Sequence, residues 1–172
     1  MEILTKPSRN GIELRKVDRR HQDIEFDRRC FDRRDRAFVF NKTVYLSDTN
    51  AFGNTYFAKY FEWQGMARES FFERFLVPMQ FQQKFFESGI KMITVEAEQK
   101  FLSETRFTDR IEIRVKMGKV RGASAELLFL FKNRRNGKLI GRGRQMVTFA
   151  NALGKIIPLP DIIRHNLKPF MP

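Results

Sequence analysis

The sequence has few residues of the kinds that bind metals or form disulfides. Its 172 residues include one cysteine, Cys30, and two histidines, His21 and His165. A single cysteine cannot close an internal disulfide, and these three residues lack the spacing of metal sites or Cys–His pairs. We therefore expect a reducing environment, no metal and no cofactor.

Common catalytic and targeting motifs are also missing. There is no Gly-x-Ser-x-Gly motif and no Gly-x-x-x-x-Gly-Lys-Ser/Thr loop, and the pair Gly141-x-Gly143 lacks the third glycine of a dinucleotide-binding turn. The first residues contain no apolar stretch of signal-peptide length. The longest strongly apolar run, Leu127 to Phe131, is far shorter than the roughly 20 residues that span a bilayer. The sequence thus predicts a cytoplasmic protein without a membrane span.

What the chain has in excess is positive charge. It contains 33 Lys and Arg against 20 Asp and Glu, a net charge of +13, while 42% apolar residues with 19 Phe are enough for one core. Residues 1–36 hold 11 basic and 8 acidic residues, a net of +3, so the remaining +10 lies on residues 37–172. Such an excess implies an anionic partner, a phosphate-bearing substrate or simply solubility, and composition alone does not choose among them.

Residues 1–36 form a charged arm in which Asp-Arg-Arg recurs at positions 18–20, 27–29 and 32–34. Its scattered apolar residues cannot bury enough surface to offset the entropy of ordering. The arm is therefore either solvated and poorly ordered, or it folds over a neighbouring subunit or an acidic partner through Ile24, Phe26 and Phe31. We place the folded domain at residues 37–172.

The domain has the pattern of an α+β fold. Phe38, Phe40, Val44 and Leu46 share one parity and predict a first strand. A long helix is expected from Gly53 to about Leu76, because Pro78 makes continuation costly. A second short helix is expected over residues 79–87.

Four strands should follow the helices. In the first two of these strands, apolar and polar residues alternate, which predicts one buried face each. The expected buried residues are Ile93, Val95, Ala97 and Phe101 in the first strand and Ile111, Ile113, Val115 and Met117 in the second. Residues 125–132 are apolar on both parities, which predicts a strand covered on both sides. Asn136-Gly137 predicts a hairpin into a last strand over residues 138–150, and residues 158–164 predict a turn and a final short helix.

The start of the long helix holds the polar residues of most interest. Asp48, Thr49 and Asn50 are helix-capping types, and Gly53 lets backbone or ligand approach closely, so unpaired N–H groups could face a cleft there. Tyr60, Gln64 and Arg68 recur every four residues and form one polar stripe. The plain alternatives are that Asn50 is a turn or capping residue and that the stripe is an ordinary solvated helix face.

The segment from Ser47 to Arg68 resembles the start of a hotdog-fold thioesterase of the 4-hydroxybenzoyl-CoA type, whose pattern is a strand, Asp-x-Asp-x-x-Gly and a long aromatic helix. The likeness is closest to the branch that serves enediyne polyketide synthesis, where Asn stands at the second acidic position, as Asn50 does here, and the helix carries Tyr60, Trp63-Gln64-Gly65 and Arg68. It covers about Phe38 to Pro160. It implies a five-stranded antiparallel sheet around a long helix and sites formed between subunits, hence a dimer or a dimer of dimers.

The resemblance also implies roles for single residues. The backbone N–H of Phe57 takes the oxyanion-donor position, and the residues expected to act in catalysis or to bind substrate are Asn50, Tyr60, Phe57 and Arg68, then Gly53, Asn54 and Gln64. Because an amide at position 50 can be neither nucleophile nor base, direct attack by water is expected. The nearest spare carboxylates, Asp48 and Glu69, fit a turn residue and an outward helix position better than a base.

Together these features predict a thioesterase acting on an acyl or polyketide thioester of coenzyme A or an acyl carrier protein. Arg142 and Arg144 could lie near the phosphates of either, although a solvated strand face explains them equally well. The alternative is a non-catalytic acyl-binding or regulatory module of the same fold, whose basic arm binds nucleic acid or an acidic protein. The Asn at position 50 keeps that alternative open.

Overall fold

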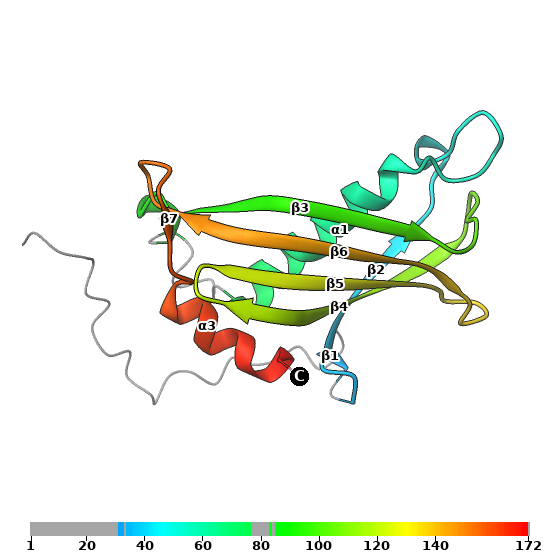
Figure 1. Ribbon diagram of the computed structural model, residues 1–172. Coiled ribbons are helices and arrows are strands. Elements are labelled where there is room, and N and C mark those ends of the chain that lie inside the picture. Colours follow the sequence, from blue (N-terminus) through cyan, green and yellow to red (C-terminus); the bar gives the residue numbers. More distant parts are fainter. Residues whose placement is uncertain (1–30, 33, 77–82, 84, 172) are drawn as a thin grey trace, which may run out of the picture.

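The computed structural model describes residues 31–32, 34–76, 83 and 85–171. In it an antiparallel sheet wraps one long helix, which lies behind the sheet in Figure 1. This α+β arrangement confirms the predicted hotdog fold, although the two-residue strands Phe31–Asp32 and Ile156–Ile157 bring the sheet to seven strands instead of the expected five. The strands are β1 (Phe31–Asp32), β2 (Ala37–Thr43), β3 (Lys91–Phe101), β4 (Arg110–Arg121), β5 (Ser124–Asn133), β6 (Leu139–Ala150) and β7 (Ile156–Ile157), in the order β1-β2-β4-β5-β6-β3 with β7 beside β6.

The long helix α1 (Ala58–Phe71) continues as a π-helical turn, η3 (Phe72–Leu76). It therefore ends where expected but begins five residues later than the predicted Gly53. Leu46, expected in the first strand, lies instead in the 3-10 turn η2 (Leu46–Asp48) and is 68% exposed. Of the predicted second helix, residues 79–82 and 84 lie outside the described residues, and Phe85 to Glu87 are helical.

The core lies between α1 and the inner face of the sheet. Ile111, Ile113 and Val115 of β4 are completely buried, as the alternation predicts, and Trp63 and Phe71 of α1 are buried with them. The C-terminal helix α3 (Asp161–Leu167) and the turn η4 (Lys168–Phe170) close one end of this core. There the ring of Phe170 packs edge-on against Phe71, with 4.6 Å between ring centroids.

Edge strand β3 departs from its predicted pattern. The register with β6 shifts between Thr94 and Glu96, which marks a β-bulge at Val95. The bulge changes which parity faces inward, so Phe101 packs against α1 whereas Ile93 and Val95 are 38% and 58% exposed. Ala97 is also exposed and Phe101 is 48% exposed, so none of the four residues expected on the buried face of this strand is buried.

Strand β5 is covered on one side rather than on both. Leu127, Phe129 and Phe131 face the core and are buried, but Leu128 on the outer face is 38% exposed. No described element lies over that outer face, which is turned toward the viewer in Figure 1. The predicted hairpin is confirmed, with Gly137 in the left-handed region at φ +69°.

The described structure reaches a few residues into the charged arm. Strand β1 pairs with β2, and the Arg114 guanidinium of β4 contacts the carboxylates of Asp32 at 2.8 Å and Asp35 at 2.6 Å. Hydrogen bonds to Asp32, from the Asp35 backbone N–H first and from Arg114 next, lower the pKa of that carboxyl group. Residues 1–30, with His21, Cys30 and the proposed anchors Ile24 and Phe26, lie outside the described residues. Among the described helices, none has the length and apolar character needed to cross a membrane.

Candidate functional site

A compact loop, residues 49–57, joins η2 to α1 and explains the late helix start. The Asn50 N–H donates to the Asn54 carbonyl at 2.9 Å, and the Gly53 N–H donates to the Asn50 carbonyl at 2.9 Å. Gly53 has φ +79°, which favours glycine. The Asn50 Oδ1 accepts the Phe52 N–H at 2.9 Å, so the side chain stabilises a turn, as one alternative predicted. Its Nδ2 group has no acceptor within the described part of the chain.

The backbone N–H of Phe57, where the loop meets α1, is a free hydrogen-bond donor. Phe57 is the N-cap residue and already has helical backbone angles, φ −55° and ψ −35°. No side chain caps this end, and among the described residues no acceptor bonds the Phe57 N–H. A free N–H at a helix start favours negative charge on a bound group. The ring of Phe57 is 56% exposed, so this end of α1 is open to an incoming molecule.

Tyr60, one turn further, lies inside the protein. Its hydroxyl is 2.9 Å from Oγ1 of Thr105, which is 2.6 Å from Oγ1 of Thr55, and all three residues are buried. Burial is the main cause that raises the pKa of Tyr60, so the phenol stays neutral. The two threonines were not predicted from sequence. This chain of hydroxyl groups joins α1 to loop 49–57 and to the β3–β4 connection.

Gln64 is completely buried against β3. Its Nε2 donates to the Glu98 carbonyl at 3.1 Å and to Oε1 of Gln99 at 2.7 Å, whereas its Oε1 has no partner among the described residues. Gly143 of β6 makes room for this amide, because a Cβ there would overlap the Gln64 side chain. The predicted contact of Gln64 with substrate would therefore have to come through its free Oε1.

Arg68 lies at the far end of the same face of α1. Its Nη1 donates to Thr94 Oγ1 at 2.5 Å and to Gln145 Oε1 at 3.0 Å, and its Nη2 is 3.9 Å from the Glu69 carboxylate. Its Nε is buried without an acceptor in the described residues. Burial lowers the pKa of Arg68, but from a value so high that the guanidinium stays charged.

These three side chains form what we call the polar seam: Tyr60, Gln64 and Arg68 between α1 and the inner faces of β3 and β6. Tyr60 is 3% exposed and Gln64 is 0% exposed, so the alternative of an ordinary solvated helix face is wrong. Two buried atoms of the seam, and Oδ1 of the neighbouring Asn54, have no hydrogen-bond partner in the described residues. In native proteins, such atoms often mark a bound water or ion or a functional role.

The carboxylates near the site are engaged or turned outward. Asp48 accepts the Tyr45 N–H at 2.8 Å and pairs with Lys42 at 2.9 Å, so it holds the η2 turn. The Glu69 side chain is 73% exposed. Asp109 accepts the Arg106 N–H at 2.9 Å and so holds a turn just before β4.

An apolar pocket of about 580 Å³ lies alongside the second half of α1. Met66 and Phe72 of the helical segment and Met92 of β3 line it, together with Phe85 and Phe86. Glu69 and Glu73 are also among the residues that line it. The pocket volume and lining suit a hydrocarbon chain.

Comparison with known proteins gives a family and a fold. The thioesterase-like superfamily matches residues 44–167. The dynemicin thioesterase, described in a study of polyene binding, has 26% identity and a TM-score of 0.72, covering 79% of this chain and 98% of that one. No curated protein matches significantly.

Two further structures are similar in fold. A 1,4-dihydroxy-2-naphthoyl-CoA thioesterase from Synechocystis has 18% identity and a TM-score of 0.69, covering 77% of this chain and 96% of its own. A hypothetical protein from Staphylococcus aureus in complex with CoA has 16% identity and a TM-score of 0.69, covering 79% and 86%. The superfamily match spans most of the chain, including the loop, α1 and the polar seam, and the chain therefore belongs to the thioesterase-like superfamily.

Proposed function

We propose that this protein is a thioester hydrolase that releases an acyl or polyketide chain from coenzyme A or an acyl carrier protein by direct attack of water. The observation that carries the proposal is the free Phe57 N–H at the start of α1, on the helix that also bears the polar seam. Membership of the thioesterase-like superfamily supports it. The expected home is the cytoplasm.

In this proposal the thioester oxygen accepts the Phe57 N–H, and the positive end of α1 stabilises its charge as water adds. The Nδ2 group of Asn50 is free to donate to that oxygen or to the water. The tetrahedral intermediate then expels the thiolate, which leaves as a thiol with a proton from the water. Neither Asp48 nor Glu69 is placed as a base, so the reaction relies on positioning and on donors.

Arg68 completes the site from a second protomer. Phe57 and Arg68 lie 11 positions apart on α1, about 16 Å along the helix axis at 1.5 Å per residue. One carbonyl cannot contact both in the same protomer. The open edge of β3, with Ile93 and Val95 exposed and Thr94 bound to Arg68, offers a place for a second copy to pair. We therefore propose a dimer, or a dimer of dimers, in which the partner's Arg68 faces Phe57 and Asn50.

Tyr60 and the loop residues support this site. The Tyr60 hydroxyl, bonded to Thr105, fixes the start of α1, and it reaches a substrate only by leaving Thr105. Gly53 and Asn54 shape the loop beside the free N–H, and the unpartnered Oδ1 of Asn54, which is buried, would accept a pantetheine amide only after the loop shifts. The apolar pocket beside α1 would take a long or polyunsaturated acyl chain.

The test is to incubate the purified protein with a panel of acyl-CoA and acyl carrier thioesters and to follow free thiol. We expect release well above buffer for at least one long-chain substrate. No release from any of them, with a folded oligomer confirmed, would end the enzyme hypothesis.

The alternative, a non-catalytic acyl-binding module, draws support from the amide at position 50 and from the turn bond that occupies its Oδ1. It predicts saturable binding of acyl-CoA without turnover. Most of its nucleic-acid arm, residues 1–36, lies outside the described residues. Salt-sensitive DNA or RNA binding that disappears when residues 1–36 are deleted would favour it.

A further inference from the structure

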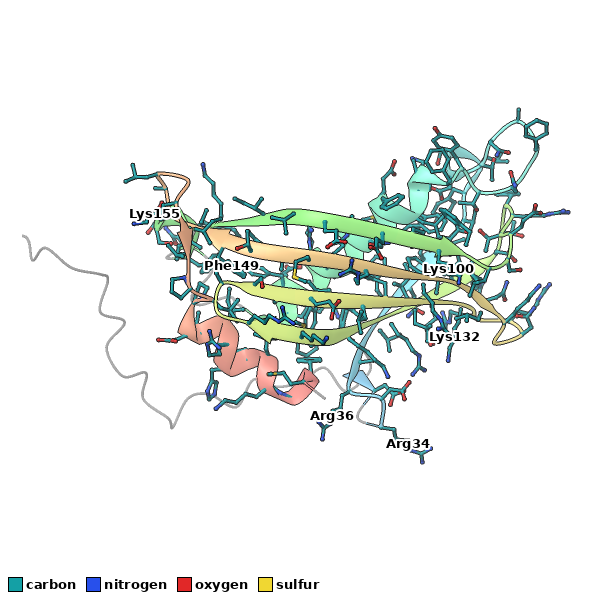
Figure 2. All side chains as sticks on the ribbon, in the orientation of Figure 1. Arg34, Arg36, Lys100, Lys132, Phe149 and Lys155 are labelled. Atoms are coloured by element: carbon teal, nitrogen blue, oxygen red, sulfur yellow. The ribbon has the colours of Figure 1, made fainter. Side chains whose placement is uncertain are left out.

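Six basic side chains gather at the end of the sheet where α1 begins. They lie on β3, β5 and β6 and on the hairpin between the last two, and we call them the basic patch: Lys100, Lys132, Arg134, Arg135, Lys138 and Arg142. Figure 2 labels Lys100 and Lys132 near this end and Lys155 at the opposite end. Among the described residues no carboxylate pairs with any of the six.

Two of these cations lie directly opposite each other. Arg142 of β6 and Lys100 of β3 are register partners on the outer face of the sheet. Like charges in this position repel and destabilise a sheet. In the neighbouring register pair on this face the charges are opposite, because Arg144 bonds Glu98 at 2.7 Å. Arg144 also contacts Glu96 and Glu126. The repulsion between Lys100 and Arg142 therefore destabilises the sheet locally, and a bound anion would relieve it.

The basic patch is joined to the candidate site. The Arg134 N–H donates to the Arg110 carbonyl at 2.8 Å, and Asn133 Nδ2 donates to Asp109 Oδ1 at 3.2 Å. The same β3–β4 connection forms a β-bridge from Arg106 to Asn54 of the loop. The β5–β6 hairpin, the β3–β4 connection and loop 49–57 thus lie next to one another. A partner bound to the basic patch would therefore lie beside the start of α1.

Exposed apolar side chains accompany the charges. Phe101, Leu102 and Phe107, which belong to β3 and to the β3–β4 connection, are each close to half exposed. Apolar anchors among basic residues are typical of an interface with an acidic protein. A single coenzyme A carries its phosphates on one nucleotide, whereas these cations extend over three strands and a hairpin.

We propose that the basic patch docks an acidic carrier protein, which presents its thioester on a phosphopantetheine arm to the start of α1. The proposal rests on the proposed function and selects the carrier-bound form of the substrate. Charge complementarity would mainly raise the association rate, so the effect should weaken with salt.

The test compares two variants that each lose three positive charges. The patch variant is Arg134→Ala/Arg135→Ala/Lys138→Ala, and the control, at the opposite end of the sheet, is Lys119→Ala/Arg121→Ala/Lys155→Ala. Each is assayed with an octanoyl group on a fatty-acid-synthesis acyl carrier protein, on coenzyme A and on N-acetylcysteamine. In the patch variant we expect kcat/KM for the carrier substrate to fall about tenfold or more. The remaining kcat/KM should depend much less on salt concentration than that of wild type. The control should stay within about twofold of wild type, and the N-acetylcysteamine rate should not change in either.

Several results would overturn the docking proposal. Equal losses with carrier and coenzyme A substrates would make the patch a phosphate site, and losses equal in both variants would reflect net charge alone. Loss of RNA or DNA binding with unchanged carrier rates would assign the patch to nucleic acid.

If wild type hydrolyses no thioester, the proposed function fails separately. Fluorescence anisotropy with labelled holo-carrier protein then decides, because about tenfold weaker binding by the patch variant supports docking and no binding to wild type refutes it.

Discussion

The close approach of α1 to the sheet depends in part on glycine at position 143 of β6, where the Gln64 amide lies against the backbone. A Cβ at Gly143 would overlap the Gln64 amide, and one at Gly141 would lie 2.7 Å from the Lys100 carbonyl oxygen. These glycines therefore serve packing rather than a nucleotide loop. Because the buried Gln64 amide bonds the edge strand β3 directly, the same contact holds β3 against the helix.

We predict that Gly143→Ala destabilises the fold by about 1–3 kcal/mol, the usual cost of forcing atoms into a filled space. Gly65→Ala is the matched control, because Gly65 is helical with open space around it, and alanine there should be neutral or stabilise by about 0.5–1 kcal/mol. Urea unfolding measures both. The double variant Gln64→Ala/Gly143→Ala should recover part of the loss. Equal stability of the two single variants would contradict the packing argument.

Tyr60 illustrates what sequence alone could not supply at the residue scale. Its place on a polar stripe was predicted, but its partner Thr105 is 45 positions away and lies in a loop without periodicity. Thr55 likewise meets Thr105 only through the fold. Long-range pairs of small hydroxyl residues leave no local pattern, so the network that positions the start of α1 was missed.

We predict that Tyr60→Phe lowers the free energy of unfolding by about 0.5–1.5 kcal/mol, the net value of one buried hydrogen bond. Burial raises the pKa of Tyr60, so above about pH 10 the unfolded chain releases this proton before the folded one does. Wild type should therefore lose stability as the pH rises through that range, and the variant should lose less. Tyr56→Phe is the control, since Tyr56 is 46% exposed. Denaturant unfolding at pH 8 and pH 10.5 checks the sign, and identical pH slopes for all three proteins would refute it.

At the scale of the elements, strand β4 was predictable and strand β3 was not. Both alternate in sequence, but β4 lies between two neighbours, whereas β3 is an edge strand whose bulge changes the inward parity at Val95. The predicted start of α1 at Gly53 was also wrong, because a local turn precedes the helix. Asn50 and Gly53 close a turn of their own, and capping residue types fit that turn as well as a helix start.

The exposed half of β3 leads to a prediction about assembly. If a second copy pairs with this edge, a lysine at the bulge should block it, as charged residues do on natural edge strands. We expect Val95→Lys to be a folded monomer in sedimentation analysis. Leu128→Lys places the same charge on the outer face of β5 and should leave dimers intact. Dissociation by Leu128→Lys alone would place the protomer interface on the sheet face instead.

At the scale of the whole molecule, the long helix separates the two halves of the proposed chemistry. Its start offers the free Phe57 N–H and Asn50, and its other half holds a charged Arg68 between Thr94 and Gln145. A protomer alone therefore has all the groups but not in one place. The sequence resemblance implied a site between subunits, and the helix geometry supplies an independent physical reason for it.

Subunit complementation tests this arrangement. Asn50→Ala and Arg68→Met should each reduce thioester hydrolysis about a hundredfold, in line with the loss of one preorganised donor. After the two variants are mixed equally and their subunits exchanged, half of the dimers are hybrids with one intact site in two, so about a quarter of the wild-type rate should return. Mixing Arg68→Met with the double variant Asn50→Ala/Arg68→Met creates no intact site and should restore nothing. If exchange is verified with differently tagged subunits and the first mixture stays inactive, Asn50 and Arg68 act within one protomer or not at all.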